Sequence, residues 1–505
     1  MNDKSPSRAV AWLVCALIAA SLYGNYYVYD SIGPVADALQ SQRGFSDQQI
    51  GLLNAIYSLP NVVLILVGGV LVDRFGAARM TVWTASICLL GALLTALSPN
   101  FAGMAAGRLL FGIGAETFGI ATLAALAQYF VGGNVAFSMG LALSIGRLGS
   151  FSSDMSPTWF PHAYAQGWQP PLMIAAAMAA ASFAAALAYW AMDRRVAASA
   201  KGEIEQQAQP FVWRDLLHFG KAYWYLLTLC VLWYSVILAF RSTFSIKYFQ
   251  HAHGLDLAAA GAMNSYVFLA AVFATPAFGW LCDRVGRYAP FLAFGAVLLP
   301  IALATMALTS TSLWVATALI GVSFSLVPAV MWPLASKLVS PSRFGTAIGL
   351  MWVAQNAGIA GANVVAGWLN DRAGASAQNP AGYESMMLFF GLASVGGAVF
   401  AVILWLTAGR KAQEAGRIPA ELGDAMGRPQ EVLLAPAFAQ ALVHRSYFRL
   451  VVTARMVEME HRRAVADPFA GHPAAIQAVA HFHVFRAITH ALIKAVDAQD
   501  VLQPA

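Results

Sequence analysis

Long apolar segments recur along most of the chain, and they constrain its fold more than any other feature. A helix needs about 20 apolar residues to cross the hydrocarbon core of a bilayer, and blocks of that length repeat from residue 9 to residue 408. Only 11% of the 505 residues are charged, whereas a soluble domain carries about 25%. The sequence therefore predicts an all-α membrane protein whose main surroundings are the lipid bilayer.

The apolar segments fall into two sets of six, which predicts twelve transmembrane helices in two pseudo-symmetric six-helix bundles. The predicted parts are a bundle at 1–192, a cytoplasmic linker at 193–218, a bundle at 219–410, and a soluble, short helical cytoplasmic C-terminal extension at 411–505. The predicted spans are 9–32, 48–72, 80–98, 101–130, 135–157, 170–192, 219–247, 257–282, 289–309, 312–338, 344–368 and 384–408.

Lysine and arginine favour the loops on one side of these spans. Loops on the opposite side hold few basic residues, chiefly Arg43, Lys247 and Arg372. Because basic loops stay in the cytoplasm, both termini are predicted to be cytoplasmic, as an even number of spans also requires. Spans rich in alanine and glycine, joined by short loops, favour a bacterial cytoplasmic (inner) membrane. The loops predicted to be cytoplasmic contain Lys4, Arg8, Arg74, Arg79, Arg194, Arg195, Lys201, Arg214, Arg284, Arg287, Arg343, Arg410 and Lys411.

A repeated motif follows the second span of each bundle. Gly69–Gly76 reads GVLVDRFG and Gly279–Arg287 reads GWLCDRVGR, so Asp73-Arg74 and Asp283-Arg284 occupy equivalent loops. Two copies in register indicate duplicated halves, as in transporters built from parallel repeats. An aspartate there can accept hydrogen bonds from a helix N-terminus or an arginine of the other half. A third, degenerate copy at Gly367–Arg372 lies on the opposite side, and we give it little weight.

These loops resemble the cytoplasmic signature of the major facilitator superfamily over about residues 9–410. Further motifs, in the right order, resemble the lysosomal dipeptide uniporter branch of that superfamily, so the chain looks like a bacterial-type homologue. The motifs are NYYVYD at 25–30, YSLPNV at 57–62, GIGAE at 112–116, RLGS at 147–150, Trp332-Pro333, GTAIG at 345–349 and Gln355-Asn356.

Two opposite charges lie halfway along predicted spans. A charge at the centre of a span costs roughly 2.5–3.5 kcal/mol on insertion scales, so it persists where it meets a cavity or a partner. Glu116 and Arg147 lie at similar depth in the fourth and fifth spans. They would either pair as a structural ion pair or clamp a zwitterion, with Glu116 on its ammonium group and Arg147 on its carboxylate. The resemblance implies that these two residues hold the termini of a dipeptide.

Three further charges in the spans leave alternatives open. Arg108 shares a helical face with Glu116 at i and i+8, and it would act in gating or be tethered to a backbone carbonyl or to Asp30. Asp30 would be a proton site, a substrate contact or an outer-rim residue. Arg241 in the seventh span would face the central cavity or lie near the outer interface and extend its head group toward water.

Polar and aromatic side chains from both halves complete the predicted site. An amide in hydrocarbon is costly without a partner, and a single tyrosine or tryptophan more often packs or anchors at the interface than binds a ligand. As a set they fit a site between two bundles. The predicted substrate-binding residues are Glu116, Arg147, Tyr26, Tyr29, Tyr57, Asn61, Arg241, Asn264, Trp332, Gln355 and Asn356. The predicted gating or coupling residues are Asp30, Asp73, Arg74, Arg108, Asp283 and Arg284.

Several function classes lack any motif in this sequence. No phosphate-binding loop, nucleophile elbow or helical zinc motif is present, so the sequence predicts neither an enzyme nor a cofactor. The four cysteines, Cys15, Cys88, Cys230 and Cys282, lie within or at the ends of apolar segments as small buried residues. In the tail, predicted helices lie near 430–463 and 472–497, and His481 and His483 alone do not make a metal site. The net charge of +6 serves topology rather than nucleic-acid binding.

The predicted function is the movement of short peptides, or another small zwitterion, by alternating access, either as uniport or linked to protons. One alternative is an organic-anion carrier that uses Arg147 and Arg241, although the carboxylate of Glu116 would repel a pure anion. Another alternative is a sensor or scaffold that acts through the tail. An accessory subunit is neither indicated nor excluded by the sequence.

Overall fold

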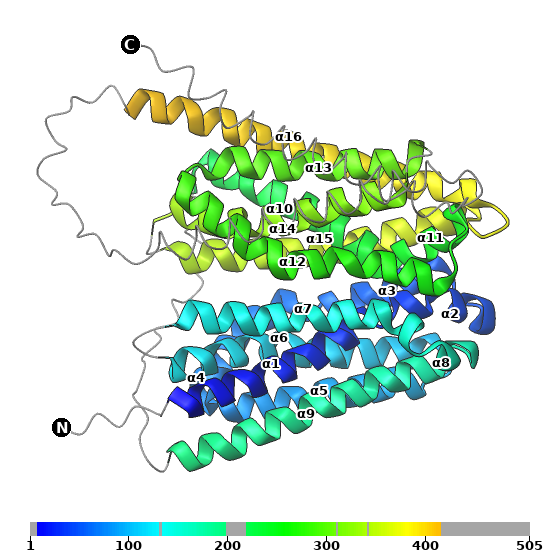
Figure 1. The fold of residues 1–505 in the computed structure, drawn as a ribbon, viewed down its shortest axis with the longest axis horizontal. Coiled ribbons are helices and arrows are strands. Elements are labelled where there is room, and N and C mark those ends of the chain that lie inside the picture. The colour runs from blue at the N-terminus through cyan, green and yellow to red at the C-terminus, as the bar shows by residue number, and fades with distance from the viewer. Residues whose placement is uncertain (1–7, 131–133, 198–218, 310–311, 341–342, 416–505) are drawn as a thin grey trace, which may run out of the picture. The chain divides into compact units, whose positions relative to one another are not determined.

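The chain is helical throughout the part that its structure describes. The computed structural model describes residues 8–130, 134–197, 219–309, 312–340 and 343–415, and every regular element among them is a helix. Met1–Ala415 forms one compact unit (Figure 1). The helices predicted in the tail, and the His481 and His483 pair, lie outside the described residues.

The first half of this unit runs from Arg8 to Ala197. The predicted span 9–32 corresponds to α1, and α2 continues the helical chain beyond its predicted end. The predicted span 48–72 consists of two consecutive segments, α3 and α4. The elements are α1 (Arg8–Asp30), η1 (Gly33–Val35), α2 (Ala36–Arg43), α3 (Asp47–Ser58), α4 (Asn61–Phe75), α5 (Ala77–Leu97), α6 (Phe101–Tyr129), α7 (Val135–Trp159), α8 (Pro161–Ala165) and α9 (Gln169–Ala197).

The second half runs from residue 219 to Ala415. Its first helix is continuous from α10 to α11 through a π-helical segment, η3. The elements are α10 (Lys221–Ala239), η3 (Phe240–Phe244), α11 (Ser245–His253), α12 (Leu257–Val285), α13 (Tyr288–Leu308), α14 (Leu313–Leu338), α15 (Phe344–Ala373), η5 (Pro380–Tyr383) and α16 (Glu384–Ala415).

The same pattern of helix packing occurs in both halves. In the first half α1 packs on α7 and α9, α5 packs on α6 and α9, and α3–α4 packs on α6. In the second half α10 packs on α15 and α16, α13 packs on α14 and α16, and α12 packs on α14. The six long helices of each half can be numbered in chain order, with α3–α4 counted as one. In both halves the first helix contacts the fifth and sixth, the third contacts the fourth and sixth, and the second contacts the fourth. This correspondence agrees with the duplication read from the repeated motif.

Local sequence signals explain where several helices begin and bend. Ser46 and Gln49 form a capping box at the start of α3, and Asn100 and Asp256 cap α6 and α12. The predicted span 48–72 breaks at Leu59-Pro60, so that α3 has 12 residues and α4 has 15. Proline lacks the N–H that would continue the hydrogen-bond ladder, which explains the break.

Ten helical segments of the described chain are long and apolar enough to cross a membrane. The two other predicted spans correspond to α3–α4, which is interrupted, and to α7, which carries many polar residues along Ser138–Ser156. The chain is thus an integral membrane protein, and the count of twelve spans stays a prediction.

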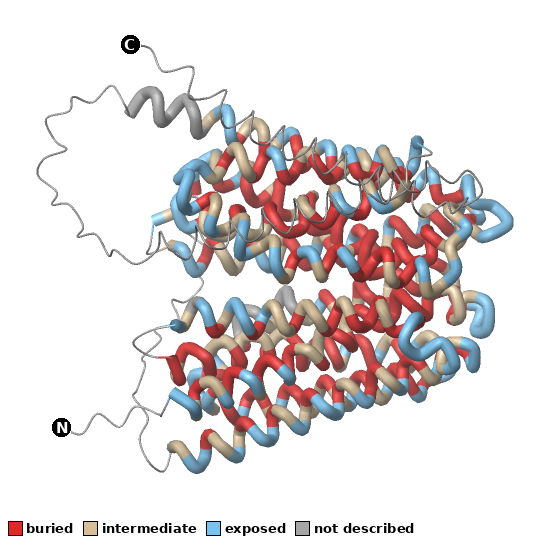
Figure 2. The backbone as a smooth tube through the Cα atoms, in the orientation of Figure 1, coloured by how far each residue is buried: buried red, intermediate tan, exposed pale blue. Residues whose placement is uncertain are grey.

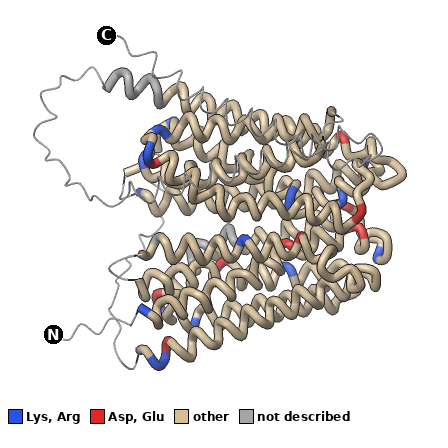
Figure 3. The backbone as a smooth tube through the Cα atoms, viewed as in Figure 1, with Lys and Arg blue, Asp and Glu red and all other residues tan. Residues whose placement is uncertain are grey.

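Two ends of the bundle are distinguished from here on. The terminal end contains Arg8 of α1 and the end of α16, and the distal end lies opposite and contains α2, α8 and α11 (Figure 1). Buried residues fill both halves and the region where the halves meet near the distal end (Figure 2). Charged residues are sparse along the middle of the helices (Figure 3). The assignment of Lys247 to a loop was wrong, because this residue lies within α11 and is 1% exposed.

Candidate functional site

A cluster of buried charges joins the halves below the distal end. Arg241 of η3 donates from Nη1 to Asp30 Oδ1 at 2.8 Å, and its Nη2 pairs with Asp154 Oδ2. All three side chains are at most 2% exposed. The side-chain amide of Asn264 also donates to Asp154 Oδ2, at 3.0 Å. Asp30 and Asp154 belong to the first half and Arg241 and Asn264 to the second, so this cluster, the charge lock, ties the halves together.

The charge lock resolves two of the sequence alternatives. Asp30 is buried and paired, so it is not a residue of the outer rim. Arg241 is 2% exposed, and its head group packs at 3.6 Å from the centroid of the Phe268 ring instead of reaching toward water. In this conformation Arg241 and Asn264 serve the contact between the halves, and their predicted role in substrate binding stays a prediction.

A second layer of contacts lies closer to the distal end. Lys247 pairs with Asp47 at the start of α3, and both side chains are at most 2% exposed. Asp371, near the end of α15, accepts the backbone N–H groups of Asp47 at 2.7 Å and of Gln48 at 2.9 Å. The third copy of the Asp-Arg motif, which received little weight above, therefore caps a helix of the opposite half, where a negative charge is favourable.

A histidine bridges the halves at the distal rim. His251 Nε2 lies 2.9 Å from Asp37 Oδ1 in α2, and its Nδ1 lies 2.8 Å from the Tyr383 hydroxyl in η5. Asp37 belongs to the first half, whereas His251 and Tyr383 belong to the second. Together with the charge lock, these layers close the distal end.

Arg108 is held by neutral groups in the first half. It is 1% exposed and donates to the carbonyl oxygens of Val28, Tyr29 and Leu53 and to Asn54 Oδ1 at 2.6 Å. The alternative of tethering to backbone carbonyls is confirmed. Asn54 connects this hydrogen-bond network to the second half. Its side-chain amide donates to Thr243 Oγ1 at 2.7 Å, and the Thr243 hydroxyl donates to Asn363 Oδ1 at 2.6 Å.

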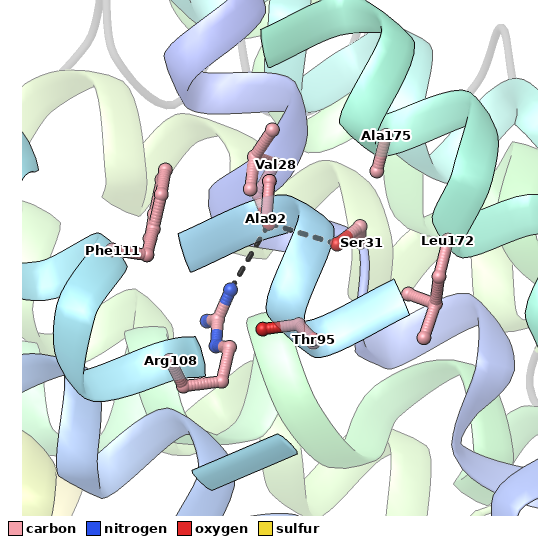
Figure 4. A pocket seen from close by; sticks show the side chains of 8 residues that line it. All are labelled: Val28, Ser31, Ala92, Thr95, Arg108, Phe111, Leu172 and Ala175. Carbon is pink, nitrogen blue, oxygen red and sulfur yellow. Dashed lines mark hydrogen bonds between the residues drawn. The ribbon is translucent and has the colours of Figure 1, made fainter. Parts of the chain in front are cut away.

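Arg108 also lines a small pocket (Figure 4). The pocket belongs to the first half alone, because its lining comes from α1, α5, α6, α9 and the turn after α1. It is therefore separate from the contact between the halves. The lining residues are Val28, Ser31, Ala92, Thr95, Arg108, Phe111, Leu172 and Ala175.

Arg147 lies among aromatic rings from both halves. Its guanidinium carbon is 5.4 Å from the ring centroid of Tyr26, 5.5 Å from that of Phe268 and 5.2 Å from that of Phe324. Tyr26 comes from α1, whereas Phe268 and Phe324 come from α12 and α14. Arg147 precedes Asp154 by seven residues on the same face of α7, which places it about 10 Å nearer the terminal end than the charge lock.

Glu116 lies on the face of α6 that carries Arg108 and Gly112. A Cβ on Gly112 would collide with the backbone of Tyr57, so α6 and α3 approach each other closely there. Tyr57 is near enough to Glu116, Tyr26 and Tyr29 to interact electrostatically with them, and its ring centroid is 4.8 Å from that of Tyr29. Tyr57, Tyr29 and Tyr26 thus form a row of tyrosines from Glu116 toward Arg147.

The second half adds rings and amides to this region. Trp332 and Trp352 stack with centroids 5.3 Å apart, and Tyr234 lies 6.4 Å from Trp332. Gln355 and Asn356 are buried on α15; Gln355 Oε1 lies 3.6 Å from Cys230 Sγ, and Asn356 donates to the Trp352 carbonyl at 3.0 Å. The side chain of Asn61 lies outside the described side chains.

The repeated Asp-Arg motifs lie at the terminal end and are exposed. Their assignment to loops was wrong, because both pairs lie in the last turns of α4 and α12. Asp73, Arg74, Asp283 and Arg284 are all solvent-accessible. Asp283 accepts from the Tyr288 hydroxyl at 2.5 Å, and Arg74 and Arg284 lie over Phe75 and Trp280 of their own helices. These contacts stay within one half, so the predicted gating role of the motifs stays a prediction.

Sequence analysis did not single out Asp154, Asp47, Asp37 and His251, and it assigned no interaction between the halves to Asp371 or Lys247. A charge at the centre of a span stands out because it is costly in hydrocarbon, whereas these residues lie near the ends of the spans. One signal was available: Asp154 follows a long apolar and small-residue segment, and a carboxylate there needs a cation. Among the described residues no group of three or more histidine, cysteine, aspartate or glutamate side chains is placed to hold a metal ion.

The family profile described as the Major Facilitator Superfamily matches residues 15–363 and 239–459. The chain belongs to the major facilitator superfamily. Two relatives are named lysosomal dipeptide transporter MFSD1. The Danio rerio protein is 30% identical over 395 residues, which cover 76% of this chain and 83% of the relative. The Homo sapiens protein is 28% identical over 382 residues, which cover 73% of this chain and 82% of the relative. The superfamily members with which the chain aligns are transporters and not enzymes. This chain is likewise a transporter and not an enzyme.

Solved structures of superfamily members share the fold. A point mutant of the nucleoside transporter NupG superposes with a TM-score of 0.63 at 13% identity, covering 77% of this chain and 99% of that one. A bacterial homologue of the human lysosomal transporter Spinster, in an inward-facing and unoccupied conformation, gives a TM-score of 0.62 at 15% identity, covering 81% and 98%. At these identities the likeness concerns the fold alone.

Proposed function

We propose that this transporter moves dipeptides across a membrane by alternating access, as a uniporter or linked to protons. The observation that supports the proposal most is the position of Arg147 between rings of both halves. A guanidinium offers a planar fork of donors that matches a carboxylate. Its location between the halves is where a superfamily transporter binds its substrate.

Glu116 would receive the other end of the peptide. It lies in the same half as Arg147, beside Tyr57, and a carboxylate there attracts an ammonium group. A dipeptide carries both an ammonium and a carboxylate group, whereas an organic anion carries only the latter. The names of the relatives, dipeptide transporters at about 30% identity, agree with this choice.

The structure would represent one end of the transport cycle, closed at the distal end. The charge lock and the contacts of Asp371 and His251 would open when the two halves rock. We further propose that the terminal end faces the cytoplasm, where the basic loops favour it, and that the membrane is a bacterial cytoplasmic membrane. The ends of α4 and α12 that carry Asp73 and Asp283 would then close the cytoplasmic side.

Measurements of peptide binding test the proposed contacts of Glu116 and Arg147 separately. Ala-Ala should raise the melting temperature of the purified full-length protein, and Glu116→Gln or Arg147→Ala should abolish that shift. Ala-Ala amide lacks the carboxylate, so its weaker binding should be insensitive to Arg147→Ala. Arg79→Ala, an exposed change at the terminal end, is the matched control and should keep the full shift.

Retained stabilisation in both site variants would reject the assignment of the clamp. Uptake of Ala-Ala into proteoliposomes, compared with uptake of a dicarboxylate, separates the peptide carrier from an anion carrier. The same uptake with and without a pH gradient separates uniport from proton-linked transport.

A further inference from the structure

Three aromatic rings of the second half form a wall next to Arg147. Trp332 of α14 and Trp352 of α15 are nearly parallel, with an angle of 18° between their planes. Tyr234 of α10 lies against Trp332 at an angle of 42°. Tyr234 is also connected to Arg147 through ring contacts. Its centroid is 4.9 Å from that of Trp233, the Trp233 ring stacks on that of Phe324, and the Arg147 guanidinium lies 5.2 Å from the Phe324 centroid. These contacts connect the rings to the proposed carboxylate end of the site.

The helical geometry of α15 directs Trp352 toward the first half. Trp352 is four residues before Asn356 and eleven before Asn363, so the three side chains share one face. Asn363 lies at the contact between the halves, since its backbone oxygen blocks any Cβ on Gly51 of α3. Trp352 is 38% exposed, on the side nearer the terminal end.

This placement distinguishes Trp352 from an interface anchor. Tryptophans in membrane proteins often lie at the headgroup level and face lipid. Trp368, on the same helix, is sixteen residues away and therefore on nearly the opposite face, with 43% exposure. The face of Trp352 is shared with buried amides, whereas nothing packs within 4 Å of a Cβ built on Gly361, half-way round the helix.

We propose that Tyr234, Trp332 and Trp352 form the pocket for the side chain of the second residue of a dipeptide, and that they select an aromatic side chain there. The inference rests on the proposed function. With the carboxylate on Arg147, the side chain attached to the same Cα is the one that reaches these rings. An aromatic side chain gains from offset or edge contacts with them. A cationic side chain would also favour ring faces, but Arg147 at the carboxylate end of the site repels it.

The experiment compares Ala-Phe, Phe-Ala, Ala-Lys and Ala-Ala as ligands of the full-length protein in nanodiscs. Trp352→Leu should weaken binding of Ala-Phe about tenfold and leave Ala-Ala and Phe-Ala within about twofold. Retained Ala-Ala binding shows that the variant is folded. Trp332→Leu should act in the same direction, and Trp368→Leu is the control that should change no affinity.

The possible outcomes separate the two proposals. An equal loss for Ala-Phe and Ala-Ala, or no loss for either, overturns the aromatic pocket while the clamp stands. A loss that is confined to Ala-Lys, or one that is larger for Phe-Ala than for Ala-Phe, also overturns it. If the wild type binds none of the four peptides, the proposed function fails and the pocket fails with it.

Discussion

Removing the cation of the charge lock should open the distal end. In Arg241→Leu, Asp30 and Asp154 lose the guanidinium that they share and face a leucine in the closed state. All three side chains are at most 2% exposed, so the loss falls in the range for breaking a buried pair, about 3–5 kcal/mol. Rocking apart hydrates both carboxylates and relieves this cost. The distal-closed state should therefore lose about two to four powers of ten in its population relative to the open state.

Distances between the halves at the distal end report this shift. Ser41 in α2 and Ala381 in η5 are exposed on opposite halves, and the four native cysteines are buried. Spin labels on Ser41→Cys and Ala381→Cys should give one short distance distribution in the otherwise wild-type protein. In nanodiscs the Arg241→Leu variant should move that distribution to longer distances.

Two further variants make the result specific to the charge lock. Arg372→Leu removes an exposed distal arginine that lies over Trp368 of its own helix, and it should leave the distances unchanged. The triple variant Arg241→Leu, Asp30→Asn, Asp154→Asn removes the charges from all three residues and should restore most of the short distances. Short distances in Arg241→Leu, or long distances in the triple variant, would refute the electrostatic reasoning.

Two other predictions concern a helix cap and a helix contact. Asp371→Asn keeps the shape of the side chain but removes the charge that caps α3, so the same labels should show a partial opening, worth about 1 kcal/mol; unchanged distances would contradict the cap. Gly149→Ala places a methyl group against the Tyr23 backbone of α1 and should lower the melting temperature by several degrees, whereas Gly140→Ala on the same helix meets open space and should not; equal melting temperatures in the two variants would contradict this close approach.

The repeat was readable from the sequence because duplicated segments keep the same pattern. Gly69–Gly76 and Gly279–Arg287 predicted two halves, and the helices of the two halves pack in the same order. Hydrophobic length also placed most helices to within a few residues. It placed the end of the seventh span too early, because Lys247 looks like a loop residue until its partner Asp47, 200 positions away, is known.

The pairing of charges across the halves was beyond what one sequence shows. The sequence allows Arg241 to face either the central cavity or the membrane–water interface, because it does not say which helix lies opposite. Asp371 lies in a degenerate motif, and its hydrogen bonds go to backbone groups of α3, which no side-chain pattern reveals. By contrast, the depth of Glu116 and Arg147 followed from counting residues along each span.

The π-helical segment η3 places one extra residue at the closure of the distal end. Three consecutive residues of η3 contact the first half. Arg241 pairs with Asp30 and Asp154. The Ser242 carbonyl and the Thr243 hydroxyl both accept from the side-chain amide of Asn54. A π turn accommodates one residue more than an α turn. Deleting a single codon within Phe240–Phe244 would remove that extra residue and restore regular α-helix, while α10 and α11 keep their relative rotation. One extra residue thus serves the contacts of Arg241, Ser242 and Thr243 with the first half without changing the direction in which Lys247 points.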